Sequence, residues 1–597
     1  MNFEFDNAQG NVQEKKKLSI CEWIAMFGCA CAAVLMFYRC FFGTALVDEA
    51  CYVSDTLAMM HGNLPYVHNW FTGCGMDFLL IPFLFVYECF VPGLEGVFLF
   101  SRICFVFFRL AILGLAFFLI KKHLKKIHVL LLICVLIPFY GGVIQNFSYH
   151  TVPIWMGFLT GLLLWGAADQ KRGRHIYYLV AGFCSAVAVF AHPIYAVNIL
   201  LFMSLIIIYD RKVSLLLWYM IGGIIEILIV FIPLIVQVGM DKVIFGIAYI
   251  LNGHTGNGGG LVKSTAGSRV LEAFRAFYLF WLAELLVFAF VYFLQRKVCT
   301  WRGLRTEKHS MYALASLCAV GAGVAAVMIL NDFDLNAYCS LGAVGSLGFL
   351  LLMKNGRKHR EIVYVGLPPL LFAWFEVILT GSNAAPIRFY SCILCFFGIL
   401  WICFQESARA VRQAAIMLAV VMIILQCYID FNYVYRDDPF RELHDKVETG
   451  VYKGIYTSSD RALDLPELEN YLDTVVSDDE LIAFRDNAPC AYLMKNQNIC
   501  DVWTWDALQY ERGNKKPLRM YSYYKAKGMI PDKIIYVDFG RTEKLSIEDP
   551  DFLYNEFVEQ YYTLTDDRRI NTTFRVKLYE NNDTFNGDFD YWIESAK

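Results

Sequence analysis

Two adjacent acidic residues, Asp48 and Glu49, stand directly after the first strongly apolar segment of the chain. A carboxylate there can act as a general base towards a hydroxyl group, or bind a divalent cation through oxygen. The alternative is that the two acids only mark the end of a helix. The stretch around them, 43–96, contains several aromatic residues but no Lys or Arg. We interpret it as the first polar loop outside a membrane.

The composition indicates that a membrane region positions this loop. Of the 597 residues, 57% are hydrophobic and 18% charged, whereas soluble proteins carry roughly 25% charged residues. Up to about residue 430 the charges cluster in short runs between apolar segments, and beyond it they are spread throughout. The net charge of -3 averages these two parts. We therefore expect a cytoplasmic tail (1–17), a transmembrane α-helical bundle (18–431) and an extracytoplasmic α/β domain (432–597).

The apolar segments are long enough to predict thirteen membrane spans, since about 20 residues cross a bilayer. The predicted spans are 18–42, 97–120, 129–147, 150–168, 176–191, 193–209, 213–237, 276–294, 311–331, 338–353, 363–380, 388–404 and 414–431. Basic runs such as 121–126 and 171–174 fall in alternate loops, which the positive-inside rule places in the cytoplasm. The N-terminus is then inside and the C-terminal domain outside. A further span at 78–92 would invert every later loop, so we expect a re-entrant or interfacial helix there.

The second long outer loop, 238–275, carries the cations Lys263 and Arg269 and a glycine-rich run at 252–260. Such a run does not hold one conformation unaided, so the loop is either a connector or a lid that orders on a ligand. In the C-terminal part we expect short strands near 479–484, 532–538 and 574–579, with a helix at 462–472.

Four cysteines lie in polar regions and offer two candidate disulfides, Cys51 with Cys74 and Cys490 with Cys500. Spacing alone does not decide either pairing. The remaining cysteines mostly lie inside apolar segments, where Cys behaves as a small hydrophobic residue.

The first outer loop resembles that of the GT-C class of polytopic glycosyltransferases, which includes aminoarabinose transferases, protein O-mannosyltransferases and Rgt-like bacterial enzymes. The matching residues are Asp48, Glu49, Tyr52, Gly62, Pro65, Tyr66 and Trp70, and Ser101-Arg102 looks like the Ala-Arg that opens the next span in many members. The resemblance in sequence covers about residues 20–200, and beyond them only the arrangement of spans and the C-terminal outer domain is similar. One departure concerns the Lys-Pro-Pro-Leu of the aminoarabinose transferases, which 72–76 replace here, so the sugar and acceptor stay open.

The resemblance implies inverting transfer of a sugar from a polyprenyl-phosphate donor to an acceptor hydroxyl of a cell-envelope glycan or lipid at a bacterial plasma membrane. Asp48, with Glu49 beside it, would be the base, and Tyr52, Tyr66 and Trp70 would bind substrate. The leaving phosphate needs cationic partners. The candidates for substrate and phosphate contacts at outer span ends and loops are Arg102, Lys263, Arg269, Arg388, His150 and His192. The one cofactor suggested is a divalent cation, Mg²⁺ or Mn²⁺, on Asp48 and Glu49 if the enzyme uses one. No nucleic acid is expected as a partner.

Two other functions stay open from the sequence. A polysaccharide polymerase or ligase would share the lipid-linked donor and use Lys263 and Arg269 of the second outer loop. A non-enzymatic transporter or flippase would use the intramembrane acids Glu226, Glu284 and Glu376. Charges inside a membrane are expensive and usually face the bundle interior, so structural pairing or protonation of these acids is the alternative.

Overall fold

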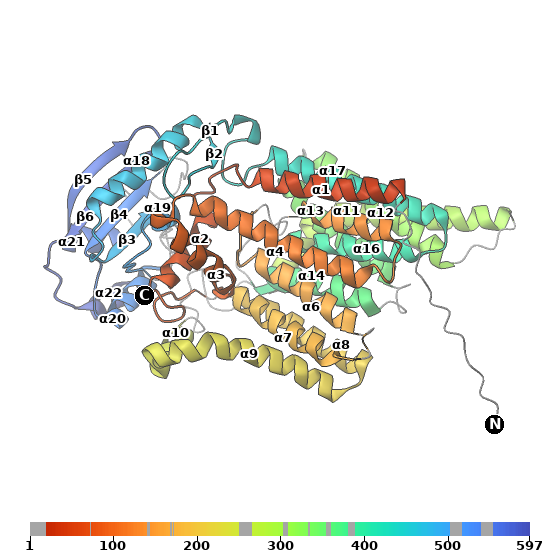
Figure 1. The fold of residues 1–597 in the computed structure, drawn as a ribbon, viewed down its shortest axis with the longest axis horizontal. Helices are drawn as coiled ribbons and strands as arrows, with labels where there is room; N and C mark the ends of the chain where they lie inside the picture. The colour runs from red at the N-terminus through yellow and green to blue at the C-terminus, as the bar shows by residue number, and fades with distance from the viewer. Residues whose placement is uncertain are drawn as a thin grey trace, which may run out of the picture.

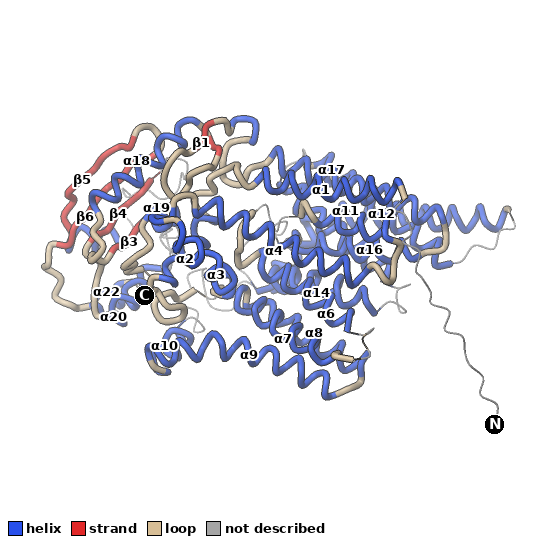
Figure 2. The backbone as a smooth tube through the Cα atoms, viewed as in Figure 1, coloured by secondary structure: helices blue, strands red, loops and turns tan. Residues whose placement is uncertain are grey.

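The computed structural model consists of a long helical bundle with a small α/β domain at one end (Figures 1 and 2). The structure describes residues 19–71, 73–139, 144–167, 170, 172–249, 266–302, 308–331, 335–353, 360–379, 388–486, 488–501, 516–538 and 553–596. Within these residues, the strands lie in the terminal domain, as Figure 2 shows in red. The predicted fold class, a membrane helical bundle followed by an α/β domain, is confirmed.

The bundle is built mainly from long apolar helices. Its helices are α1 (Ile20–Arg39), α2 (Asp48–Met60), α3 (Gly75–Phe90), η1 (Pro92–Leu94), α4 (Val97–Ile120), α5 (Lys126–Leu136), α6 (Thr151–Ala167), α7 (Arg174–Ala191), η3 (Pro193–Tyr195), α8 (Ala196–Leu205), the π-helix η4 (Ile206–Asp210), α9 (Val213–Val238), α10 (Met240–Tyr249), α11 (Ala266–Trp301), α12 (Lys308–Leu330), α13 (Leu335–Met353), α14 (Arg360–Leu379), η7 (Tyr390–Ile393), α16 (Leu394–Gln405) and α17 (Arg409–Asn432).

Each predicted span contains a helix of the structure. In the described part of the chain, nine helical segments are long and apolar enough to cross a membrane, and four more are apolar but shorter. The chain is thus a multi-pass membrane protein. The apolar surface of α9 fits this, because side chains such as Ile229 and Val236 point away from the protein. Two helices differ most from prediction. Helix α5 ends at Leu136, eleven residues before the expected end of its span, and α11 begins at Ala266, ten residues before the expected start of its own, through turns that carry Arg269 and Arg275.

The segment predicted as re-entrant or interfacial forms α3, a helix of 16 residues that contains Pro82. At 1.5 Å per residue it is about 24 Å long, less than the roughly 30 Å of a bilayer core. Phe85 and Phe90 are exposed, whereas Leu80 and Leu84 are buried. A short helix with one apolar face turned outward is compatible with a place at the membrane surface, which stays a prediction.

The C-terminal domain contains a mixed four-stranded sheet of order β3-β4-β6-β5, with β3 and β4 parallel and the other pairs antiparallel. Its elements are η8 (Phe440–Glu442), β1 (Asp445–Lys446), β2 (Tyr456–Thr457), α18 (Ser459–Val475), β3 (Ile482–Asp486), α19 (Ala488–Met494), α20 (Lys516–Lys527), β4 (Lys533–Asp538), α21 (Leu553–Tyr561), β5 (Tyr562–Ile570), β6 (Phe574–Asn581) and α22 (Phe589–Ser595). The three predicted strands lie at β3, β4 and β6. The edge strand β5 was missed because its middle is polar and largely exposed.

The first outer loop joins the domain to the bundle. Thr44 donates through both its amide and its hydroxyl to Asp437, at 2.6 and 2.9 Å, and the same carboxylate forms a buried ion pair with Arg461 at 2.7 Å. The backbone of Gly96 donates to Gly450 O at 2.9 Å. The domain therefore rests on the end of the bundle formed by residues 42–98, close to α2 and α3 (Figure 1).

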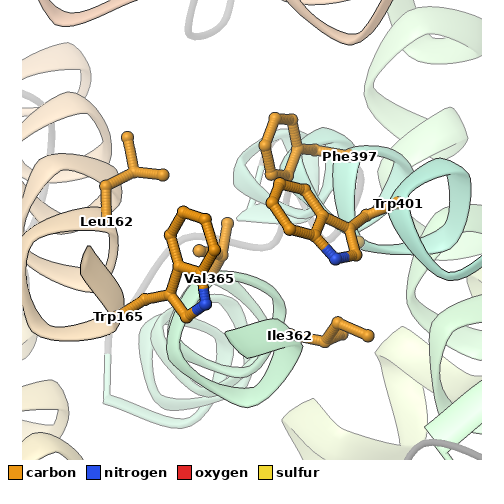
Figure 3. A pocket seen from close by; sticks show the side chains of 7 residues that line it. Leu162, Trp165, Ile362, Val365, Phe397 and Trp401 are labelled. Atoms are coloured by element: carbon orange, nitrogen blue, oxygen red, sulfur yellow. The ribbon is translucent and has the colours of Figure 1, made fainter. Parts of the chain in front are cut away.

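An apolar pocket lies inside the bundle, away from this end. Its lining residues are Leu162, Trp165, Ile362, Val365, Phe397, Gly398 and Trp401 (Figure 3). Trp165 and Trp401 meet edge to face with ring centroids 5.0 Å apart. Trp165 stands four turns along α6 from the end near residue 150, roughly 22 Å away. The pocket offers no charged group for chemistry.

Neither candidate disulfide forms in the structure. Cys74 Sγ instead donates to Phe71 O at 3.1 Å, and Cys51 lies within the buried helix α2. Cys490 and Cys500 are likewise buried as thiols.

Candidate active site

Asp48 is the first residue of α2 and lies at the seam between the bundle and the C-terminal domain. Its Oδ2 is 2.8 Å from Nε of Arg436, which the segment leading into the domain supplies. Arg436 has a positive φ of 52°, a left-handed conformation that strains a residue with a Cβ. Burial raises the pKa of the Asp48 carboxyl, and the Arg436 charge acts against that rise. Asp48 is thus a buried carboxylate with one cationic partner.

Glu49, the adjacent acid, is held in a different way. Its Oε2 is 2.7 Å from Nε of Arg102, and both side chains are almost fully buried. Its Oε1 accepts the backbone N–H of Gln145 at 3.0 Å. Arg102 also donates to the carbonyl oxygens of Cys40 and Phe42. The structure therefore places Arg102 inside the protein as the partner of Glu49, where it fixes the turn before α2.

Asp48, Tyr52 and Asp55 follow one another along one face of α2, at the spacing of successive helical turns. The ring of Tyr52 meets that of Tyr149 edge to face, with centroids 5.8 Å apart. Further along, Thr56 donates to Asp77 at 2.7 Å. Burial and the nearby charge of Asp55 raise the pKa of Asp77 well above its usual value. This face of α2 is lined with buried polar groups.

Tyr149 lies between the Asp48 face of α2 and a second cluster of polar side chains at the same end of the bundle. Its ring lies 3.9 Å from that of His150 and 5.8 Å from that of His192. His192 Nε2 is 3.9 Å from Oε1 of Glu376, and the same oxygen pairs with Arg388. The structure thus brings together His150, His192 and Arg388, three residues that the sequence predicted separately.

This second cluster combines a fixed cation with neutral imidazoles. Burial lowers the pKa of both His150 and His192, and the charge of Arg388 lowers them further. Within the described residues, Nδ1 of each histidine and Nε of Arg388 have no hydrogen-bond partner. An unsatisfied buried polar atom costs about 1–3 kcal/mol, so several in one place are a feature of a binding site. The arrangement suits a polar, anionic ligand.

The other predicted site residues lie elsewhere or have structural contacts. Tyr66 stacks on Phe231 of α9 with centroids 5.7 Å apart, and Trp70 is buried against the C-terminal domain. Arg269 donates to Ile378 O at 3.3 Å, at the end of α14 that carries Glu376. Lys263 and the glycine-rich run 252–260 lie outside the described residues.

The acidic pair does not fit a divalent cation. Both oxygens of Glu49 already have partners, and Asp48 faces the guanidinium of Arg436. Metal ions need several oxygen or nitrogen ligands converging on one point. Across the described ranges no three His, Cys, Asp or Glu side chains are grouped in that way. Asp48 and Glu49 therefore act in ion pairs with Arg436 and Arg102.

Sequence reasoning missed Arg436, Tyr149, Asp55 and Asp77, and treated Glu376 as a separate intramembrane acid. The spacing of Asp48, Tyr52 and Asp55 was the available signal for Asp55, once 48–60 is read as a helix rather than a loop. Arg436 follows the last span closely, but nothing local connects it with residue 48.

The chain resembles known proteins in structure rather than in sequence. No family model matches the chain, and no curated protein matches its sequence. Among solved structures, it aligns with the crystal structure of ArnT from Cupriavidus metallidurans bound to undecaprenyl phosphate. The alignment covers 94% of this chain and 98% of that chain, with a TM-score of 0.42 and 10% sequence identity.

Proposed function

We propose that this protein is a membrane glycosyltransferase that transfers a sugar from a polyprenyl-phosphate donor to a hydroxyl group of an acceptor. One observation carries the proposal. A carboxylate, Asp48, and a cationic cluster around Arg388 lie at the same end of the bundle and are linked by the rings of Tyr52 and Tyr149. Transfer from a phosphate-linked sugar needs a base and a cation on opposite sides of the reacting carbon.

Asp48 acts as the general base in this proposal. Its carboxylate accepts the proton of the acceptor hydroxyl as that oxygen forms a bond to the anomeric carbon. The bond from the anomeric carbon to the phosphate oxygen breaks in the same displacement, so the configuration inverts. Burial raises the pKa of Asp48 and makes its carboxylate a stronger base, while Arg436 keeps it ionised.

Arg388 and the two histidines receive the leaving phosphate. Negative charge grows on the phosphate as the bond breaks, and a cation fixed in a buried site stabilises it most effectively. Nε of Arg388 supplies one donor, and imidazole N–H groups of His150 and His192 supply neutral ones. Glu376 holds the guanidinium in place.

The membrane supplies the donor in this proposal. A polyprenyl chain remains in the bilayer beside the helices while its phosphate reaches the cluster at their ends. The loops at the opposite end carry the basic runs, so the active end and the C-terminal domain face the outside of a bacterial plasma membrane. The acceptor is then a cell-envelope glycan or lipid.

The test replaces Asp48 by Asn in cells whose own copy of the gene is deleted. Mass spectrometry of envelope glycans and polyprenyl-phosphate sugars is expected to show loss of one glycan modification and accumulation of one donor. Asp473→Asn, an exposed aspartate of α18 that pairs with Lys495, is the matched control and keeps the wild-type pattern. Normal glycans in Asp48→Asn cells at normal protein levels would refute Asp48 as the base.

The same assay separates the other functions. A polymerase or ligase that relies on the second outer loop loses activity in Arg269→Gln and keeps it in Asp48→Asn. A transporter moves lipid-linked sugar across proteoliposome membranes without chemical turnover, and wild-type protein doing so would refute the enzyme.

A further inference from the structure

Trp70 lies at a junction of three segments at the edge of the bundle. Its ring is 6.0 Å from that of Phe245 on α10 and 5.3 Å from that of Tyr523 on α20, measured between centroids. Gly246 of α10 packs directly against the backbone of Tyr66, leaving no room for a Cβ. The first outer loop, the surface helix α10 and the C-terminal domain therefore meet around one tryptophan.

Three basic side chains surround this junction. Lys242 is one helical turn before Phe245 and Gly246, and Lys527 Nζ is 5.3 Å from the ring centre of Tyr523. His68 is two residues before Trp70. Burial lowers the pKa of His68, and the charges of both Lys527 and Lys242 lower it further, which places the three groups near one another.

These lysines have no acidic partner among the described residues, although the neighbouring Lys525 pairs with Asp590 at 2.5 Å. Two like charges held together without a counterion repel each other, and burial together with Lys242 lowers the pKa of Lys527. The protein keeps this arrangement on its surface, which indicates that an anion from outside completes it.

An exposed apolar surface adjoins the lysines. At the end of α9 and along α10, the side chains of Val236, Met240, Ile244 and Phe245 are each at least half exposed, up to 79% for Val236. α9 is a candidate span, and α10 begins two residues after it ends. The cations thus stand where an exposed apolar surface of the protein ends.

We propose that Lys242, Lys527 and His68 bind the phosphate of an anionic phospholipid whose acyl chains lie along α9 and α10. The lysine ammonium groups contact the phosphate oxygens, and the imidazole of His68 adds a hydrogen bond. The lipid would join α10 of the bundle to α20 of the C-terminal domain and hold the domain down on the membrane. This site is separate from Asp48 and Arg388 and does not depend on the proposed transfer reaction.

The test uses the full chain in detergent, titrated with phosphatidylglycerol or with phosphatidylcholine of the same acyl chains, and native mass spectrometry to measure bound lipid. Two lysines near a membrane surface predict a preference of about 30-fold for the anionic lipid. The variant Lys242→Gln with Lys527→Gln is expected to lose that preference. Lys525→Gln, on the same helix but paired with Asp590, keeps it.

Thermal unfolding without lipid verifies that all variants fold, and both lysines are accessible enough for Gln to be accommodated. An unchanged lipid preference in the folded double variant would overturn the proposal. A second arm replaces lipid by inorganic phosphate at the same concentration. Stabilisation by phosphatidylglycerol alone supports a lipid site, whereas equal stabilisation by phosphate alone would overturn the assignment to a lipid.

Discussion

Arg436 Nε lies 2.8 Å from Asp48 Oδ2. The two residues are far apart in the sequence, since Asp48 follows α1, the first helix of the bundle, and Arg436 follows α17, the last. The C-terminal domain therefore contributes a charge to the candidate active site in addition to covering it. Arg436 has a left-handed backbone conformation, and the neighbouring Asp437 fixes the segment through Thr44 and Arg461.

Replacing Arg436 by Gln is expected to move the acidic limb of the pH–rate profile to higher pH. Asp48 must be a carboxylate to accept a proton, and the Arg436 charge lowers the pKa of Asp48. Without that charge the pKa of Asp48 rises further. The acid limb of kcat/KM should shift upward accordingly, so activity falls more at pH 6 than at pH 8.5. Arg436→Lys should restore most of the profile, and an unshifted limb in Arg436→Gln would contradict the pairing.

Replacing Glu49 by Gln is expected to destabilise the protein rather than to change substrate affinity. It leaves Arg102 buried without its counterion, which costs about 3 kcal/mol. The thermal unfolding midpoint in detergent should fall, and Arg102→Gln should lower it similarly. The double variant Glu49→Gln with Arg102→Gln should lower the unfolding midpoint by less than the sum of the two single effects. If Arg102 binds the leaving phosphate instead, Arg102→Gln would raise the donor KM with little change in stability.

Replacing Arg388 by Gln is expected to lower kcat by about 100-fold, as the loss of one transition-state donor does in other enzymes. The measurement is donor turnover by purified protein. Because the change leaves Glu376 buried alone, Glu376→Gln with Arg388→Gln is the companion variant, which should recover stability but not activity. Arg269→Gln, whose guanidinium bonds the backbone of Ile378, is the control and should retain most activity. Recovery of turnover in the double variant would exclude a role for Arg388 in the chemistry.

Replacing Asp486 by Asn is expected to stabilise the protein at alkaline pH. Burial and the charge of Asp538 raise the pKa of Asp486 to about 8, above the unfolded value near 3.9. Between these values the folded chain binds a proton that the unfolded chain has lost, so the free energy of unfolding decreases as pH rises from about 4 to about 8. Asn removes this loss and tolerates the positive φ of 64°. The shift of about four units is worth on the order of 5 kcal/mol, so unfolding should become less favourable for the variant by about that amount at pH 9 and equal to wild type at pH 4. An equal difference in the free energy of unfolding between variant and wild type at pH 4 and at pH 9 would contradict the raised pKa of Asp486.

The sequence predicted those features that depend on local pattern. Long apolar runs predicted the helices of the bundle. The change from clustered to evenly spread charges near residue 432 predicted the domain that follows α17. His150, His192 and Arg388 were found because each stands at the end of an apolar run, and the structure places those ends together.

Partners that meet only through folding were not predictable in the same way. Nothing near Arg102 indicates that it faces Glu49 instead of solvent or substrate, because the contact depends on how α4 packs against the turn before α2. Tyr66 and Trp70 stand in a motif that suggests substrate binding, yet the domain and α9 bury them. The edge strand β5 has no apolar alternation because only its two ends are buried.

The contacts that join the first outer loop to residues 436–461 have a consequence for biosynthesis. A ribosome delivers Asp48 and Thr44 early, whereas Arg436, Asp437 and Arg461 are translated only after the last span. Asp48 therefore lacks its cationic partner Arg436 until the remaining helices of the bundle have been translated. The contacts of Asp48 and Thr44 are thus completed only when residues 436–461 have been translated.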